Sequence, residues 1–76
     1  MTLTTAYLLG RDLDAAYRSI LAGDYAFVTA PLDSARERLE RAVVDGVKDY
    51  EEAFVAYIRT EIKSYAAHAA ALKETT

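Results

Sequence analysis

Apolar residues recur every three or four positions along most of the chain, which is the period of an amphipathic helix. In the first segment this spacing places Ala6, Leu9, Leu13, Ala16, Tyr17 and Ile20 on one face. Thr4 or Thr5 is a suitable N-cap residue, and Gly23 is a suitable end because glycine accepts left-handed backbone. We therefore predict a helix over residues 4–22. Gly10 lies inside it, where glycine costs about 1 kcal/mol relative to alanine, so we expect close packing of a neighbouring helix there.

The period is interrupted over residues 24–33, "DYAFVTAPLD". Tyr25 and Phe27 are too apolar for a fully solvated loop, and Pro31 disfavours helical backbone at the residue before it. We predict an ordered loop, with at most one short turn, folded over the helix ends. The functional alternative is an exposed aromatic loop that inserts into a partner.

The helical period then continues to the end of the chain. Its apolar positions are Leu39, Val43, Val47, Tyr50, Phe54, Tyr57, Ile58, Tyr65, Ala69 and Leu72. Ser34 with Glu37 has the spacing of a capping box, which marks a helix start. The unbroken period favours one helix over residues 34–73, about 60 Å long at 1.5 Å per residue. The alternative is a break at the Asp–Gly pair that ends in Gly46, which gives helices over 34–46 and 48–73.

These elements predict an all-α fold, with two or three amphipathic helices forming a small bundle in a single helical domain, residues 1–76. Hydrophobic residues make up 53% of the chain, but many are alanines, and there is no cysteine. A chain this short has a thin margin of stability without disulfides or metals, and oligomerisation is a common remedy. The long apolar face from Leu39 to Leu72 exceeds what one short helix covers, so we expect a homodimer.

The net charge of the chain bears on which classes of partner it can bind. Nine basic and twelve acidic residues give a net charge of −3, which argues against direct binding of nucleic acid, since phosphate contacts need clustered Lys and Arg. No apolar run approaches the ~20 residues of a membrane span, and the first residues lack the pattern of a signal peptide. The expected location is therefore the cytoplasm.

Most charged residues have the spacing of ion pairs on a solvated helix face. The pairs predicted four residues apart are Arg36–Glu40, Glu37–Arg41, Arg41–Asp45 and Lys48–Glu52. Asp45, Asp49 and Glu52 are less balanced, and a continuous helix would place them on one side with Glu51 nearby. They predict either a solubilising surface or a docking patch for a basic partner. A divalent-metal site is disfavoured because no other ligands converge on them.

The segment "YIRTEIKSYAAHAAAL", residues 57–72, places Glu61 and His68 on the apolar face. Seven residues separate them by roughly 10 Å, so they do not touch within one helix. A buried carboxylate needs a partner or a proton. Three interpretations follow: a wet edge where the apolar face ends, a polar seam that fixes the register of a dimer, or a pocket for a small ligand or metal that Glu61, Tyr65 and His68 would line.

No phosphate-binding loop, metalloprotease histidine pair, EF-hand loop or nucleophile elbow is present in the sequence. We therefore expect no enzyme activity and no cofactor, and interpret the chain as a small acidic protein-binding module: an adaptor, an assembly part or a regulator. The aromatic residues expected to contact a partner are Tyr25, Phe27, Tyr50, Tyr57 and Tyr65. A narrower alternative is an acidic inhibitor that covers a basic, nucleic-acid-binding surface, as small phage-encoded anti-defence proteins do.

Overall fold

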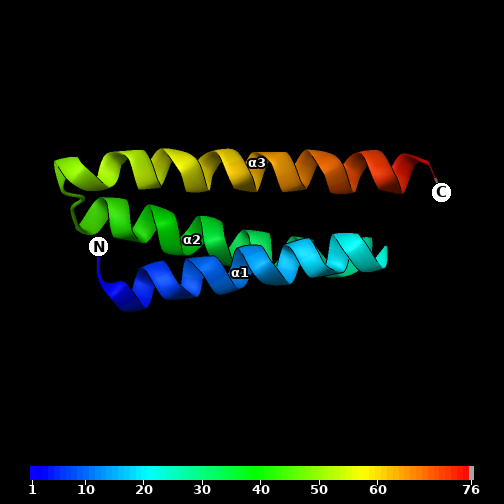
Figure 1. The fold of residues 1–76 in the computed structure, drawn as a ribbon, viewed down its shortest axis with the longest axis horizontal. Helices are drawn as coiled ribbons and strands as arrows, with labels where there is room; N and C mark the ends of the chain where they lie inside the picture. The colour runs from blue at the N-terminus through cyan, green and yellow to red at the C-terminus, as the bar shows by residue number, and fades with distance from the viewer. Residues whose placement is uncertain (76) are drawn as a thin grey trace.

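The protein is an all-α bundle of three helices, as the sequence predicts. The computed structural model describes residues 1–75, and no strand occurs in that range. The helices are α1 (Leu3–Ala22), α2 (Thr29–Asp45) and α3 (Glu52–Glu74), with short 3₁₀ turns η1 (Tyr25–Phe27) and η2 (Asp49–Glu51) at the connections. α1 and α3 run in the same direction and α2 runs in the opposite one (Figure 1). The bundle measures 42 × 18 × 16 Å.

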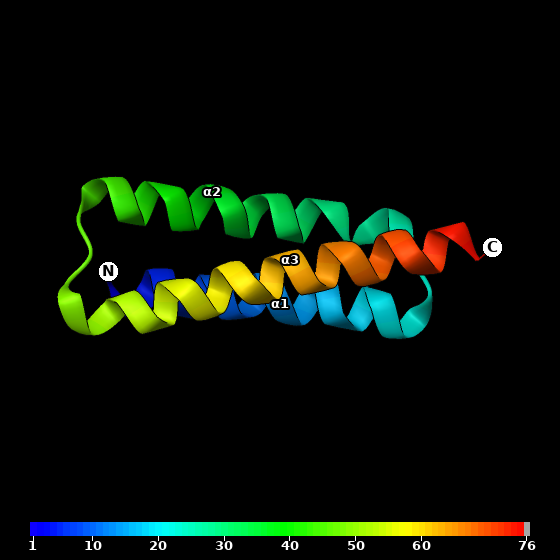
Figure 2. The same ribbon diagram turned by 90° about the horizontal axis from the view of Figure 1, so that it is seen from above.

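The three helices form a triangle in cross-section. α2 lies to one side of the layer that α1 and α3 share (Figure 2). The surface between α1 and α3 therefore lies on the side of the bundle away from α2.

Both ends of α1 are capped by local hydrogen bonds. The cap at its start is Thr2 rather than the predicted Thr4 or Thr5: the Thr2 hydroxyl oxygen accepts from the Thr5 N–H at 3.1 Å. Gly23 ends the helix as predicted, with φ +76°. Its N–H donates to Ile20 and the Asp24 N–H donates to Ser19, at 3.1 and 2.9 Å. These two bonds form a Schellman motif, which needs left-handed backbone at the glycine.

The prediction of a loop over residues 24–33 is wrong for its second half. α2 begins at Thr29, and Pro31 lies in its first turn. Proline is tolerated there because the first amides of a helix have no acceptor within it, so its missing N–H costs nothing. Ser34 and Glu37 consequently lie inside the helix and form no capping box at its start.

The prediction of one continuous helix from 34 to 73 is also wrong. α2 ends at Asp45, and Gly46 adopts φ +113° and ψ +129°, which no helix contains. The chain then passes through η2 into α3. There the Lys48 N–H donates to the Glu51 carboxylate at 3.1 Å, and the Glu51 N–H donates to the Lys48 carbonyl at 2.8 Å. The alternative of a break at Gly46 is the one confirmed.

The core lies along the axis of the bundle and draws residues from all three helices. Its buried side chains are Leu9, Leu13, Ala16 and Ile20 of α1, Val28, Leu32, Ala35 and Leu39 at and along α2, and Val55, Ile58, Ile62 and Ala69 of α3. The face predicted for the first helix is confirmed, although Tyr17 lies at its exposed edge. On α3 the buried line runs through Val55 and Ile62, so Tyr57 falls outside it.

Two ion pairs join neighbouring helices, and sequence spacing did not predict either. Asp12 of α1 lies 3.4 Å from Arg38 of α2, and Glu40 of α2 lies 3.1 Å from Arg59 of α3. Within α2 the predicted Glu37–Arg41 pair forms at 2.8 Å. The Glu37–Arg41 and Glu40–Arg59 pairs are exposed and contribute little to stability, whereas the facing atoms of Asp12 and Arg38 are buried.

Across the described residues, none of the helices combines the length and the apolar character needed to cross a membrane.

Candidate functional site

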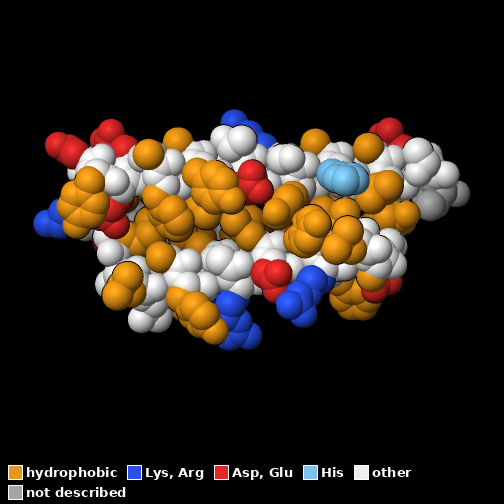
Figure 3. Space-filling view, in the orientation of Figure 1, with side chains coloured by type: hydrophobic (Ala, Val, Ile, Leu, Met, Phe, Trp, Pro, Cys, Tyr) orange, Lys and Arg blue, Asp and Glu red, His pale blue; other side chains and the backbone are white. Residues whose placement is uncertain are grey.

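The aromatic side chains that a partner could contact gather between α1 and α3. Tyr17 from α1 and Phe54, Tyr57 and Tyr65 from α3 line a groove of ≈270 Å³ on this side. We call these four residues the aromatic face. In the space-filling view the hydrophobic side chains follow the boundary between the two helices (Figure 3). The side of the bundle away from α2 therefore carries these four aromatic residues.

Two tyrosines fix the geometry of the aromatic face. The rings of Tyr17 and Tyr65 lie 6.1 Å apart with an interplanar angle of 35°, within the range at which aromatic pairs attract each other. Tyr17 is 46% exposed and Tyr57 is 56% exposed. Each ring thus rests one edge on the protein and offers the other to solvent, an arrangement that allows tyrosine to bury more surface when a partner binds.

Gly10 lies in the floor of the same groove, and the expectation that a neighbouring helix packs closely on it is wrong. A methyl group added at Gly10 would meet no atom within 4 Å. The glycine is exposed and deepens the groove beside Tyr17 instead of admitting α2 or α3. The absence of a side chain here leaves room for a partner's backbone to approach α1.

A carboxylate, Glu61, lies one turn before Tyr65 of the aromatic face. Partial burial of the phenol raises the pKa of Tyr65 above its usual value of 10.0, and the Glu61 carboxylate one turn earlier adds to the effect. Glu61 itself is half-buried, whereas His68 is exposed. His68 therefore lies in water where the apolar face ends. The side chain that Glu61 affects is Tyr65, not His68.

The remaining predicted aromatic residues are not brought to this surface. Tyr25 lies half-buried in η1 and Phe27 is 69% exposed beside it, at the connection between α1 and α2. Tyr50 is 81% exposed in η2, at the opposite connection. The fold thus distributes the five predicted aromatic residues over three places, and the prediction missed two exposed tyrosines, Tyr7 and Tyr17.

The acidic residues near the α2–α3 connection separate into two groups. Asp45, Asp49 and Glu52 are exposed, and the break at Gly46 removes the single helix face on which they were expected. Glu51 has a structural role: its carboxylate accepts from the Lys48 N–H and from the Met1 amino group, each at 3.1 Å. The bond from the Lys48 amide, followed by that from the Met1 amine, lowers the pKa of Glu51 below its usual value of 4.5.

Within residues 1–75 no three His, Cys, Asp or Glu side chains are close enough together to hold a metal ion. Glu61 and His68 accordingly belong to no such metal-binding group there. Sequence reasoning also missed the contact between Asp12 and Arg38, because Asp12 falls on the polar side of the first helix. Only the position of α2 brings the two together.

Comparison with known protein families, with curated proteins and with solved structures finds no match to this chain.

Proposed function

We propose that this chain is a small acidic protein-binding module without catalytic activity, and that partners dock on its aromatic face. The observation that carries the proposal is the partial exposure of Tyr17 and Tyr57 along a groove between two helices. Tyrosine is enriched at protein interfaces because its ring buries much area while its hydroxyl group stays hydrated.

The shape of the groove favours a helical segment as the docked element. α1 and α3 lie side by side and leave the position of a fourth helix empty, and amphipathic helices commonly bind in such grooves. Gly10 would admit small side chains of the docked helix close to α1, while Tyr57 would cover its flank. A partner helix with small apolar residues three and four positions apart fits this surface best.

We extend the proposal to a homodimer, in which the same face of a second copy supplies the helices. The prediction from a 40-residue helix no longer supports a dimer, because the helix breaks at Gly46. The support now comes from surface area. The accessible surface is 5222 Å², whereas the scaling for compact monomers gives about 4,600 Å² for a chain of 8.4 kDa. The excess is of the order of one partner's share of a standard interface.

A second candidate uses the acidic end of the bundle. Asp45, Asp49 and Glu52 are exposed there, so a basic partner, including a nucleic-acid-binding surface that the chain would block, has carboxylates to contact. Changing Asp49 and Glu52 to Lys should abolish binding to such a partner without unfolding the protein. Unchanged affinity of this double variant would reject the acidic candidate and leave the aromatic face.

The main proposal is tested by placing a photo-crosslinking phenylalanine analogue at Tyr57, and in a separate variant at Lys63. Lys63 is an exposed residue of the same helix outside the groove. Irradiation in the native cell should give a crosslinked product from position 57 and none from position 63. A product of twice 8.4 kDa would identify the homodimer, and a different mass would identify another partner. Equal products from both positions, or none from either, would reject the aromatic face as the docking surface.

A further inference from the structure

A second line of residues on α1 faces solvent instead of the core. Its positions recur at alternating spacings of four and three, so they share one narrow side of the helix. They are Leu3, Tyr7, Gly10, Asp14, Tyr17 and Leu21, and all of them are exposed. We call these residues the α1 stripe. Single exposed apolar residues are ordinary on a protein surface, but a line of them at heptad spacing is typical of a helix that packs against another helix.

The α1 stripe is continuous with the aromatic face. Gly10, Asp14 and Tyr17 also line the ≈270 Å³ groove between α1 and α3. Beyond the groove, Leu3 is 90% exposed and Leu21 is 69% exposed, at the two ends of the helix. The stripe therefore extends the docking surface over the whole of α1, whose 20 residues span about 30 Å.

The order of side chains along the α1 stripe is nearly the same in both directions. The pairs at equal distances from position 12 are Leu3 with Leu21, Tyr7 with Tyr17, and Gly10 with Asp14. In a contact with two-fold symmetry, residue i of one copy meets residue j of the other, and j meets i. Two antiparallel α1 helices with their axis at the level of position 12 therefore set leucine against leucine and tyrosine against tyrosine. At the centre, Gly10 has no side chain and leaves space for Asp14 of the second copy.

α3 repeats this arrangement beside the stripe. The rings of Tyr65 and Tyr17 lie 6.1 Å apart, and α1 and α3 run in the same direction (Figure 1). Phe54 lies eleven residues before Tyr65, and Tyr7 lies ten residues before Tyr17, so Phe54 and Tyr7 lie at similar levels along the bundle. Both helices thus carry aromatic residues on either side of the level of position 12.

The charges beside the stripe are complementary between two such copies. Arg11 is exposed and takes part in none of the ion pairs within residues 1–75. It follows Gly10, which lies opposite Asp14 of the second copy, so its long side chain has that carboxylate within reach. Asp14 is paired with Arg18 of its own chain at 2.9 Å and is 58% exposed. A carboxylate accepts from more than one donor, so Asp14 has room for Arg11 as well.

We propose that two copies of this chain associate through their α1 stripes, antiparallel and with two-fold symmetry about the level of position 12. This inference rests on the proposed function, because it takes a second copy as the occupant of the aromatic face. The contact would cover the leucines and tyrosines of the stripe and would place Arg11 of each copy beside Asp14 of the other.

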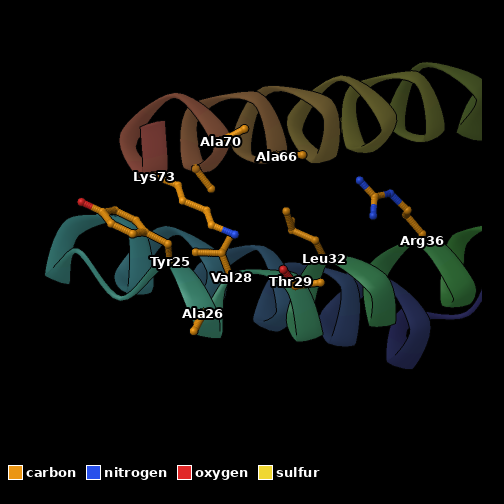
Figure 4. A pocket seen from close by; sticks show the side chains of 10 residues that line it. Tyr25, Ala26, Val28, Thr29, Leu32, Arg36, Ala66, Ala70 and Lys73 are labelled. Atoms are coloured by element: carbon orange, nitrogen blue, oxygen red, sulfur yellow. The ribbon is translucent and has the colours of Figure 1, made fainter. Parts of the chain in front are cut away.

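A larger cleft on another flank of α3 provides a reference position for the test. It has a volume of ≈580 Å³, lies between η1, the first part of α2 and the last part of α3, and shares no lining residue with the aromatic groove. Figure 4 shows Ala66 and Ala70 of α3 on one side of it and Val28 and Leu32 on the other. None of the described residues that line it belongs to α1. Ala70 is exposed there and lies outside the proposed contact.

The chain has no cysteine, so introduced cysteines report which positions meet. Leu3→Cys and Leu21→Cys, mixed in a glutathione redox buffer, should form disulfide-linked dimers, because a disulfide needs Cα atoms within about 7 Å and the antiparallel pair sets these positions together. Each variant alone should remain unlinked, because its two cysteines lie at opposite ends of the dimer. Leu3→Cys mixed with Ala70→Cys is the control and gives the background. Non-reducing electrophoresis measures all four samples. Linkage of either variant alone, or a Leu3–Leu21 mixture at background, would overturn the proposal.

Arg11→Glu tests the complementary charges. The change replaces two attractions per dimer with two repulsions, so the dissociation constant of the dimer in sedimentation equilibrium should rise about tenfold. Lys63→Glu makes the same charge change at an exposed position of α3 outside the groove and should leave the constant unchanged. Equal effects of the two variants would overturn the pairing of Arg11 with Asp14.

Crosslinking at Tyr57 separates this inference from the proposed function. A Tyr57 product that does not have twice the mass of the chain, without the Leu3–Leu21 disulfide, would support the aromatic face as a docking surface and overturn the second copy as its occupant. A product of twice 8.4 kDa without the disulfide would overturn the antiparallel register alone. The disulfide without any product from Tyr57 would support the α1 contact and reject the aromatic face.

Discussion

The two halves of α3 have the same helical period but opposite effects on the bundle. The first half places Val55, Ile58 and Ile62 in the core, and these branched side chains fill the space to α1 and α2. The second half places Ala66 and Ala69 at equivalent positions, and the ≈580 Å³ cleft opens beside them. The two grooves beside the first half are each smaller, ≈260 Å³ near Val55 and ≈270 Å³ near Tyr57.

The comparison shows that a helical period predicts which side of a helix is buried, but not how well that side is packed. Packing depends on volume, and alanine supplies little. The first half of α3 should therefore carry most of the stability, and the second half should tolerate change or be available for binding. Each prediction below tests one side of this difference.

The largest effect is expected for Ile58→Ala in the packed half. Ile58 is 2% exposed, and truncation of such a residue costs the lost burial plus the cavity left behind, about 3 kcal/mol. Urea denaturation measures the free energy of unfolding. Tyr57→Ala, at the exposed neighbouring position, is the control and should cost under about 1 kcal/mol. Equal losses from the two variants would show that the aromatic face, not Val55–Ile62, faces the core.

The next largest effect on stability is expected at Gly46, which ends α2 and leads into the connection to α3. Gly46→Ala should destabilise the protein by about 2 kcal/mol, because φ +113° is strained for any residue with a side chain. Gly10→Ala is the matched control. A methyl group there meets only open space and removes the helix penalty of glycine, so it should stabilise by about 1 kcal/mol. A neutral Gly46→Ala variant would mean that the break does not depend on this backbone conformation.

The sequence predicted the elements whose signals are local. The face of α1 and its end at Gly23 follow from spacing and from the conformational range of glycine, which do not depend on the rest of the fold. The start of α2 was missed because the rule against proline applies to helix interiors, and Pro31 lies in a first turn. Whether Gly46 bends or breaks a helix depends on where α3 packs, which is tertiary information.

The candidate site was predicted only in part for a related reason. On α3 two sets of apolar positions have nearly the same spacing, one through Ile58 and Ile62 and the other through Tyr57 and Tyr65. Tyrosine suits a core edge and a wet surface alike, so the pattern alone did not separate them. The cleft was missed because alanine favours a helix, but its presence in the sequence does not show where its small side chain leaves space between helices unfilled.

In the open half, Ala66→Met should raise the free energy of unfolding by about 1 kcal/mol. Ala66 is half-buried and lines the cleft, and the longer side chain would bury apolar area that is now exposed to water. Ala67→Met, on the exposed side of the same turn, should change stability by less than about 0.5 kcal/mol. Thermal unfolding measures both. A loss of stability in Ala66→Met would show that the open half is already closely packed.

The smallest effect on stability concerns Glu51, in the connection just before α3, and it appears only when the pH is varied. The pKa of Glu51 in the folded protein lies below the 4.5 expected for the unfolded chain, because the Lys48 amide and the Met1 amine bind its carboxylate. Between these two pKa values the unfolded chain binds more protons than the folded one, so stability falls as the pH falls. The contribution of Glu51 is therefore complete above pH 4.5 and is lost as the pH drops through the lowered pKa.

Glu51→Gln should flatten this acid limb in thermal unfolding measured from pH 6 down to pH 3. Glu52→Gln, the same charge change at an exposed neighbour, should keep the wild-type profile. Identical profiles for the two variants would show that the Glu51 carboxylate does not hold this connection.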